Sequence, residues 1–188
     1  MTGTFDLGLL RKRIQEGRFT PESKENSPVA AVAVIINPKD NGGSVLLIER
    51  TERMGDPWSG QIAFPGGHKA SDDRDFLETA IREAKEEVGI ELREHQLLGH
   101  LPLVYARTRR VQVVPYVFEL TSDAMVRKNE EVSESFWTPL SSLEKIEATR
   151  TEVDVKEGKF NVDAYSYGGH LIWGLTFRII NILLDRTG

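Results

Sequence analysis

An uninterrupted apolar segment, VAAVAVII at Val29 to Ile36, limits the folds open to this chain. It is rich in β-branched residues and is typical of a buried strand. The residues Asp40-Asn41-Gly42-Gly43 follow it and favour a turn. A second apolar segment then runs from Val45 to Ile48, so we expect the two strands to form a hairpin.

The remaining segments predict further strands mixed with a few helices. We expect strands at Leu97 to Ala106, Val111 to Leu120 and Val132 to Trp137, and helices at Phe5 to Glu16, Phe76 to Val88 and Leu171 to Leu184. Glycines and prolines predict that Gly55 to Gly67 is mostly loop. Because strands and helices do not alternate regularly, the pattern indicates an α+β fold or a mixed-sheet sandwich. We expect one domain over 1–188, with an N-terminal helix and connector at 1–28.

Composition excludes several classes of protein. The chain has 188 residues, a formal net charge of −5 and no cysteine. The negative charge argues against a general nucleic-acid-binding protein, and the lack of cysteine excludes disulfides, thiolate metal sites and a cysteine nucleophile. The most apolar segment, Leu171 to Leu184, is too short to span a bilayer, and the N-terminus lacks the charge order of a signal peptide. We therefore expect a soluble, cytoplasmic protein.

The expected helix at Phe76 to Val88 combines an apolar stripe with an acidic patch. Asp75 is a plausible N-cap and Gly89 follows the last turn. At about 100° per residue, Glu83, Glu86 and Glu87 lie together on one side, and the opposite side carries Leu77, Ala80, Ile81, Ala84 and Val88. The three carboxylates repel one another, and a hard divalent cation would relieve that repulsion. The alternative is a solvated acidic face. The i,i+4 spacing also predicts an ion pair between Glu78 and Arg82.

Two glycines precede this helix, in Phe64-Pro65-Gly66-Gly67, where backbone can approach a ligand closely. Together with Arg82-Glu83-Ala84-Lys85-Glu86-Glu87-Val88-Gly89-Ile90, the segment 66–90 resembles the Nudix box, a glycine and an acidic residue followed by R-E-apolar-x-E-E-x-G-apolar. The loop between the two halves holds one residue more than the usual pattern. The first acidic position therefore falls on either Asp73 or Asp75.

Further segments, in matching order, resemble the coenzyme A pyrophosphatase branch of that family. They are Leu46 to Arg50, the V-x-P-x-V segment Val113 to Val117, the segment Glu131 to Leu140, and the IWG-x-T segment Ile172 to Thr176. The stretch from Arg50 to Gly60 departs from the branch by one extra residue, which moves its basic residue, Arg53, to a different register. The resemblance implies a Nudix-type mixed β-sheet sandwich flanked by helices. It also implies hydrolysis of a diphosphate linkage in a nucleotide derivative such as coenzyme A or acyl-coenzyme A, which would give 3′,5′-ADP and phosphopantetheine.

The resemblance further implies roles for individual residues. Mg²⁺ or Mn²⁺ would be bound by Glu83, Glu86 and Glu87, with Glu131 as a further ligand and Glu134 as an alternative to it. Arg82 belongs with the three helical glutamates in the catalytic group, and Glu83 is the expected base. The expected substrate-binding residues are Arg50, Arg53, Gly66, Gly67 and Arg109, the arginines because their planar donors suit phosphate.

Two alternatives remain open at this stage. One is a Nudix hydrolase acting on NADH, a nucleotide sugar, a nucleoside triphosphate or a capped RNA, and the other is a nucleotide-sensing domain without catalysis. We expect a small nucleotide as the partner rather than nucleic acid or a membrane. Members of the family often form homodimers, so a homodimer is a further expectation, although no segment of the sequence identifies an interface.

Overall fold

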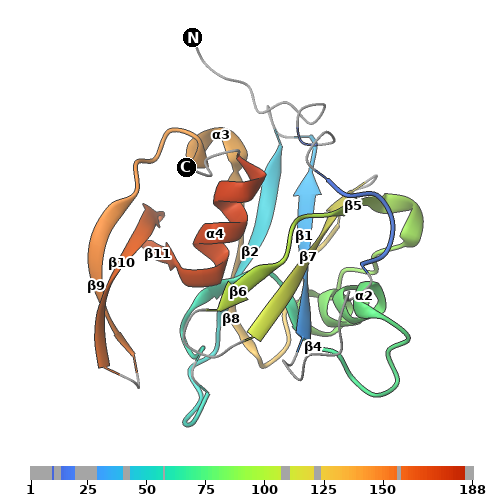
Figure 1. Cartoon of the computed structure of the whole chain (residues 1–188), viewed down its shortest axis with the longest axis horizontal. Coiled ribbons are helices and arrows are strands. Elements are labelled where there is room, and N and C mark those ends of the chain that lie inside the picture. The colour runs from blue at the N-terminus through green and yellow to red at the C-terminus, as the bar shows by residue number, and fades with distance from the viewer. Residues whose placement is uncertain are drawn as a thin grey trace.

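The computed structural model describes residues 10, 14–19, 29–39, 43–56, 58–106, 111–120, 124–155 and 158–184. Over these residues it contains a large mixed sheet, a smaller antiparallel sheet and a few helices (Figure 1). The large sheet consists of β1 (Val29–Asn37), β2 (Ser44–Arg50), β3 (Ile62–Ala63), β4 (Gly66–His68), β5 (Leu97–His100), β6 (Val104–Ala106), β7 (Val111–Glu119) and β8 (Val132–Pro139). The small sheet consists of β9 (Thr149–Val155), β10 (Gly158–Tyr167) and β11 (His170–Trp173). The helices are α2 (Phe76–Val88), α3 (Leu140–Leu143), α4 (Gly174–Leu183) and the 3₁₀ turn η1 (Glu94–Gln96).

Strand β1 lies at the centre of the large sheet, which confirms the buried strand expected at Val29 to Ile36. It pairs in parallel with β7 along its length and antiparallel with β2, where Ile36 faces Val45. The predicted hairpin is therefore present. Strand β2 in turn pairs with β3 and β8, and β4 pairs with the other end of β1.

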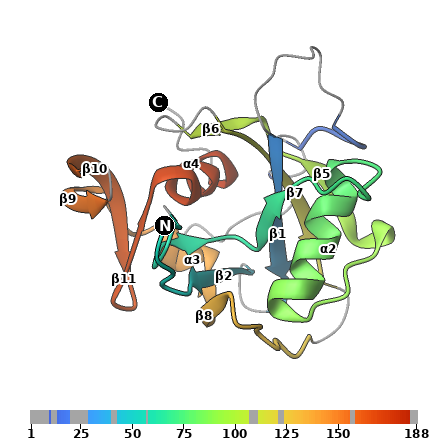
Figure 2. The ribbon, with the colours of Figure 1, turned by 90° about the horizontal axis from the view of Figure 1, so that it is seen from below.

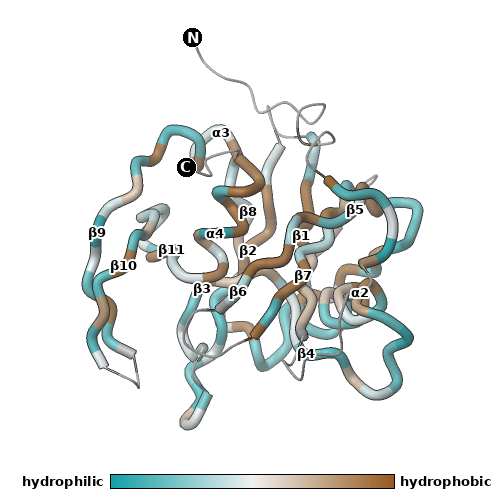
Figure 3. Tube along the Cα trace, viewed as in Figure 1, coloured by the Kyte–Doolittle hydropathy of each residue, from teal (hydrophilic) through white to brown (hydrophobic). Residues whose placement is uncertain are grey.

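The two faces of the large sheet carry separate hydrophobic cores, with α2 on one face and α4 on the other (Figure 2). Alternate residues of β1 supply both cores: Ala31 and Ala33 contact the α2 side, whereas Val34 and Ile36 contact the α4 side. Hydrophobic residues accordingly concentrate on the central strands β1 and β7 (Figure 3). This arrangement confirms the α+β, mixed-sheet fold with flanking helices.

The hydrophobic core on the α4 side joins the small sheet to the large one. Tyr165 of β10 is almost fully buried there with Ile172 of β11 and Ile180 of α4. The hydroxyl of Thr176 in α4 donates a hydrogen bond of 2.8 Å to the carbonyl of Ile62 in β3. The small sheet and α4 are therefore fixed against the edge of the large sheet that contains β2 and β3.

The described part of Gly55 to Gly67 is mostly loop, as predicted, and also contains β3 and the start of β4. Two predicted boundaries are wrong. The strand expected at Leu97 to Ala106 is divided into β5 and β6. The helix expected to begin at Leu171 begins at Gly174, whose positive φ of 65° separates it from β11, where residues 170–173 pair with β10. The hairpin of β9 and β10 was not predicted.

The N-terminal segment is described only in part. Most of the helix expected at Phe5 to Glu16, and residues 20–28 of the connector, lie outside the described residues. Where it is described, Gln15 is not helical and exchanges two backbone hydrogen bonds of 2.9 Å with His100. Gly99 makes this contact possible, because a Cβ there would lie closer than 3.0 Å to the side chain of Ile14. Within the described residues, no helix is both long and apolar enough to cross a membrane.

Candidate active site

Helix α2 has the predicted bounds and holds the acidic patch against the large sheet. The Asp75 side chain accepts a hydrogen bond of 2.9 Å from the Glu78 amide, and Gly89, at φ 68°, donates to the carbonyls of Ala84 and Lys85. Residues of the apolar stripe are buried against the large sheet, chiefly β1, and the small side chains of Ala80 and Ala84 let the helix approach the sheet closely. The local sequence thus fixes which side of the helix faces away from the core.

The three glutamates of the patch differ sharply in exposure. The side chain of Glu86 is 55% exposed, that of Glu83 is 14% exposed, and that of Glu87 is 2% exposed. Burial raises the pKa of Glu83, and burial raises the pKa of Glu87 to about 7. Only Glu86 therefore matches the alternative of a solvated acidic face.

Glu87 is turned towards the glycine pair. Its Oε2 accepts a hydrogen bond of 2.9 Å from the Gly66 amide, and its Oε1 lies 3.5 Å from Nη1 of Arg50. The Nε of Arg50 is buried without a hydrogen-bond partner among the described residues. Burying a charge is costly unless it is paired. The described protein groups therefore compensate the negative charge of Glu87 only in part.

The glycine pair is required by close contacts on both sides. A Cβ at Gly66 would lie closer than 3.0 Å to the backbone of Ala31 and Val32 in β1. A Cβ at Gly67 would lie closer than 3.0 Å to the carboxylate of Glu83. Gly66 thus allows β4 to pair with β1, and Gly67 leaves room for the Glu83 side chain.

Arg82 connects the patch to the loop before α2. Its Nη1 donates to Glu83 at 2.8 Å and to Glu86 at 3.0 Å. Its Nε and Nη2 donate to both carboxylate oxygens of Asp73, at 2.9 and 3.0 Å. The arginine therefore holds two of the three helical glutamates, and Asp73 holds the arginine.

The predicted ion pair between Glu78 and Arg82 is wrong. Glu78 instead pairs with Arg74, at 3.0 Å, because Asp73 occupies the donors of Arg82. Asp73 is 5% exposed and also accepts from the Ala70 amide and the Thr79 hydroxyl, both at 2.9 Å. The Arg82 hydrogen bonds, aided by these, lower the pKa of Asp73 to about 2.

The ambiguity between Asp73 and Asp75 is thereby resolved. Asp73 serves the acidic patch through Arg82, whereas Asp75 caps the helix and forms an ion pair with Arg18. The sequence could not separate these roles, because both aspartates lie within the same short loop. The bidentate contact with Arg82 depends on the path of that loop, not on helical spacing.

Two predicted substrate-binding arginines lie near the patch, Arg50 at the end of β2 and Arg53 in the loop that follows. Arg50 pairs with Asp56 at 3.0 Å, and Arg53 pairs with Glu131 at 3.1 Å. A surface hollow of about 380 Å³ is lined by Glu52, Arg53, Met54 and Ser59. The role of Asp56 was missed by sequence reasoning, although its position before Pro57 is typical of a turn. The predicted Arg109 lies outside the described residues.

Glu131 lies near the buried carboxylates, as its predicted role requires. Its charge contributes to the raised pKa of both Glu83 and Glu87, after the larger effect of burial. Glu134 points elsewhere and lies near His170. Among the described residues, the only group with three ligand atoms within 4.8 Å of one another is Glu49, Glu134 and His170, so the helical glutamates are not gathered as closely as they would be around one ion.

The patch nevertheless fits a hard divalent cation. Its donors are carboxylate oxygens, which Mg²⁺ and Mn²⁺ prefer. The carboxylates of Glu83 and Glu87 are desolvated, and a bound cation would offset the cost of burying their charge. The guanidinium of Arg82, which contacts both Glu83 and Glu86, is the group that would have to yield some of its contacts.

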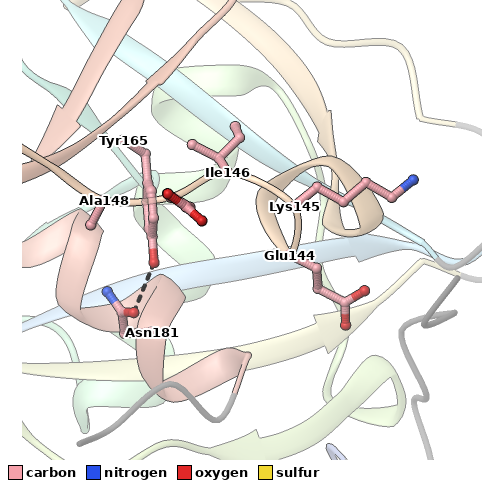
Figure 4. A pocket seen from close by; sticks show the side chains of 7 residues that line it. Glu144, Lys145, Ile146, Ala148, Tyr165 and Asn181 are labelled. Atoms are coloured by element: carbon pink, nitrogen blue, oxygen red, sulfur yellow. Dashed lines mark hydrogen bonds between the residues drawn. The ribbon is translucent and has the colours of Figure 1, made fainter. Parts of the chain in front are cut away.

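A second hollow, of about 450 Å³, lies between α3, β10 and α4 (Figure 4). It is lined by Glu144, Lys145, Ile146, Glu147, Ala148, Tyr165 and Asn181. Tyr165 donates a hydrogen bond of 2.8 Å to the Asn181 side chain at its base. None of the predicted site residues lines this hollow, so it is separate from the acidic patch.

The fold and the carboxylate helix define a Nudix-type hydrolase, and comparison with known proteins agrees. The NUDIX domain model matches residues 26–156, so the chain belongs to the Nudix family and is a Nudix hydrolase. An uncharacterized Nudix hydrolase, NudL of Pectobacterium atrosepticum, is 34% identical over 87% of this chain and 83% of its own length. The mitochondrial coenzyme A diphosphatase NUDT8 of Mus musculus is 30% identical over 89% of this chain and 81% of its own length.

Solved structures support the fold. A MutT/nudix family protein from Enterococcus faecalis superposes with a TM-score of 0.60 at 18% identity, covering 90% of this chain and 64% of that one. The NUDIX domain of Shewanella oneidensis NrtR, solved with ADP ribose, gives a TM-score of 0.59 at 18% identity, covering 89% of this chain and 93% of that domain. Both identities are low, so these likenesses concern the fold alone.

Proposed function

We propose that this Nudix hydrolase cleaves the diphosphate linkage of coenzyme A or an acyl-coenzyme A with the help of Mg²⁺ or Mn²⁺. The observation that carries the chemistry is the pair of desolvated carboxylates, Glu83 and Glu87, beside the glycines. The choice of substrate is supported by the coenzyme A diphosphatase among the relatives and by the segments that resemble that branch.

Each residue in and around the acidic patch has its own role in the proposed hydrolysis. Burial raises the pKa of Glu83, which suits a group that accepts a proton from the attacking water. Arg82, fixed by Asp73, holds the Glu83 carboxylate in place. Arg50 and Arg53 would contact the phosphate oxygens, because the planar donors of arginine suit that task. The donor set for the divalent cation is Glu83, Glu86 and Glu87 with Glu131, and the cation would supply charge neutralisation of the diphosphate.

A substrate panel tests this proposal. Coenzyme A, acetyl-coenzyme A, NADH, a nucleotide sugar and a nucleoside triphosphate would each be incubated with the enzyme and Mg²⁺ or Mn²⁺. We expect 3′,5′-ADP and phosphopantetheine, or its acyl form, in equal amounts, detected by chromatography and mass spectrometry. Faster turnover of another member of the panel would overturn the coenzyme A assignment, and binding without turnover of any member would favour the nucleotide-sensing alternative.

A matched pair of variants tests the role of the patch. Glu86→Gln removes one exposed carboxylate from the predicted donor set and should abolish cation-dependent turnover. Glu91→Gln removes an exposed carboxylate just beyond α2, whose contact is Lys85, and should leave turnover unchanged. Circular dichroism should show the same fold for both. Full activity in Glu86→Gln would contradict the proposed cation site.

A further inference from the structure

A second group of possible metal ligands lies on the opposite side of β2 from Glu87. Glu49 on β2, Glu134 on β8 and His170 on β11 bring one ligand atom each within 4.8 Å of one another. Glu49 precedes Arg50, and successive side chains of a strand point to opposite faces of the sheet. Glu49 therefore belongs to the α4 side of the sheet, and Arg50, with Glu87, to the α2 side.

The two glutamates face each other across paired strands. Glu49 and Glu134 are direct partners in the antiparallel register of β2 and β8. Like charges in this position destabilise a strand pair unless a cation lies between them. His170 is the only basic group of the described residues within ion-pair distance of either, with Nδ1 at 3.5 Å from Glu49 and Nε2 at 3.8 Å from Glu134. Both distances exceed that of a normal hydrogen bond, which is about 2.9 Å.

The imidazole is held in place from one side. Its ring stacks on Phe136 with centroids 4.2 Å apart and planes inclined by 7°. It follows the turn of Gly168 and Gly169, which both have positive φ. One ring nitrogen lies near each carboxylate, and 18% of the side chain is exposed. Solvent and ions therefore have access to it.

We propose that Glu49, Glu134 and His170 form a second cation site, which takes a borderline transition-metal ion such as Zn²⁺ in preference to Mg²⁺. One imidazole nitrogen and two carboxylate oxygens are a donor set that suits Zn²⁺, whereas Mg²⁺ prefers oxygen ligands alone. Ligand atoms around a tetrahedral zinc ion with bonds of about 2.1 Å are about 3.4 Å apart. The three ligand atoms lie within 4.8 Å of one another, so side-chain rotations that draw them together would close the site.

Such a site would join the two sheets. Glu49 and Glu134 belong to the large sheet and His170 to the small one, which packs on it beside β3. An ion bound only by the folded protein stabilises it in proportion to its affinity and concentration. Zn²⁺ should therefore raise the melting temperature of the protein, through ligands that the proposed hydrolysis does not use.

Zinc binding to the full-length, metal-free protein tests the site. Titration calorimetry is best performed in a Glu83→Gln/Glu86→Gln background, so that zinc does not bind the acidic patch of α2. We expect one Zn²⁺ site, at least tenfold tighter for Zn²⁺ than for Mg²⁺. His170→Gln should weaken Zn²⁺ binding by tenfold or more, since loss of even an indirect metal contact has an effect of that size. His95→Gln, an exposed histidine on η1, should leave binding unchanged.

Glu134→Gln provides a second variant if His170→Gln fails to fold. Its side chain is 55% exposed, so it should fold normally and show the same loss of affinity. Unchanged Zn²⁺ affinity in either folded variant, or equal affinity for Zn²⁺ and Mg²⁺, would overturn the proposal. Because the measurement is of binding and not of turnover, its outcome is independent of the substrate panel.

Discussion

Replacing Glu87 with glutamine should remove a pH-dependent penalty from the metal-free protein. Burial raises the pKa of this carboxyl from 4.5 to about 7, and only 1% of the residue is exposed. Between these two pH values the folded state binds more protons at this site than the unfolded state does. Stability therefore falls as pH rises through this range, and the full penalty applies above pH 7. A shift of this size corresponds to about 3 kcal/mol.

The variant isolates that penalty because glutamine has nearly the same shape. Its amide oxygen can still accept the hydrogen bond from the Gly66 amide, but it carries no charge to desolvate. Urea denaturation followed by tryptophan fluorescence, in EDTA, would give the free energy of unfolding from pH 5 to pH 8. We expect Glu87→Gln to gain about 2–3 kcal/mol relative to wild type across that range. Glu86→Gln should keep the wild-type pH dependence, because Glu87 remains.

Divalent cations should largely cancel the stability advantage of Glu87→Gln over the wild type. At pH 8 and 100 times its dissociation constant, Mg²⁺ should stabilise the wild type by about 2.7 kcal/mol. Glu87→Gln, which lacks a predicted ligand, should gain much less. If the stability difference between the variant and the wild type does not change with pH, the argument from desolvation is refuted. If Mg²⁺ stabilises both proteins equally, Glu87 is not a ligand.

Two further predictions concern the groups around the patch. Asp73→Asn should destabilise the fold by about 2 kcal/mol at pH 7, and denaturation should show this difference disappearing as pH falls from 4 towards 2. In steady-state kinetics the same variant should have a lower kcat, because Arg82 is misplaced. Gly66→Ala should disrupt the fold through backbone collisions, whereas Gly67→Ala should fold but lose activity because Glu83 is displaced. A melting temperature lowered equally in both glycine variants would contradict this distinction.

The sequence predicted what depends on local spacing. The bounds of α2, its caps and the common side of Glu83, Glu86 and Glu87 follow from a helical repeat and from Asp75 and Gly89. The central strand β1 was evident from its continuous apolar residues. In these segments the residues that define the element also define its environment, so no distant contact was needed.

Contacts between distant segments were not predictable in the same way. The buried orientation of the Glu87 side chain depends on its hydrogen bond from the Gly66 amide. Strand β4 brings that amide to the helix by pairing with β1. The partner of Arg82 was misassigned because helical spacing favours Glu78, whereas the loop brings Asp73 to the guanidinium.

The small sheet was missed for a different reason. Its β9–β10 hairpin has few buried residues and carries exposed ion pairs of Arg150 with Asp163 and of Lys159 with Glu152. It therefore lacks the apolar alternation of a half-buried strand. The segment Leu171 to Trp173, which belongs to β11, was included in a helix because its apolar residues continue into α4. Only the positive φ of Gly174 shows where one element ends and the next begins.

The parallel pairing of β1 with β7 has a consequence for how the protein folds. The paired residues, Val29 with Gln112 to Ile36 with Glu119, are separated by about 80 positions in the chain, and loop closure over that length must precede their contact. The β1–β2 hairpin and α2 are local and can form much earlier. The glutamates of α2 therefore share a helix early in folding, but the sheet on which that helix packs is completed only by a late, long-range step.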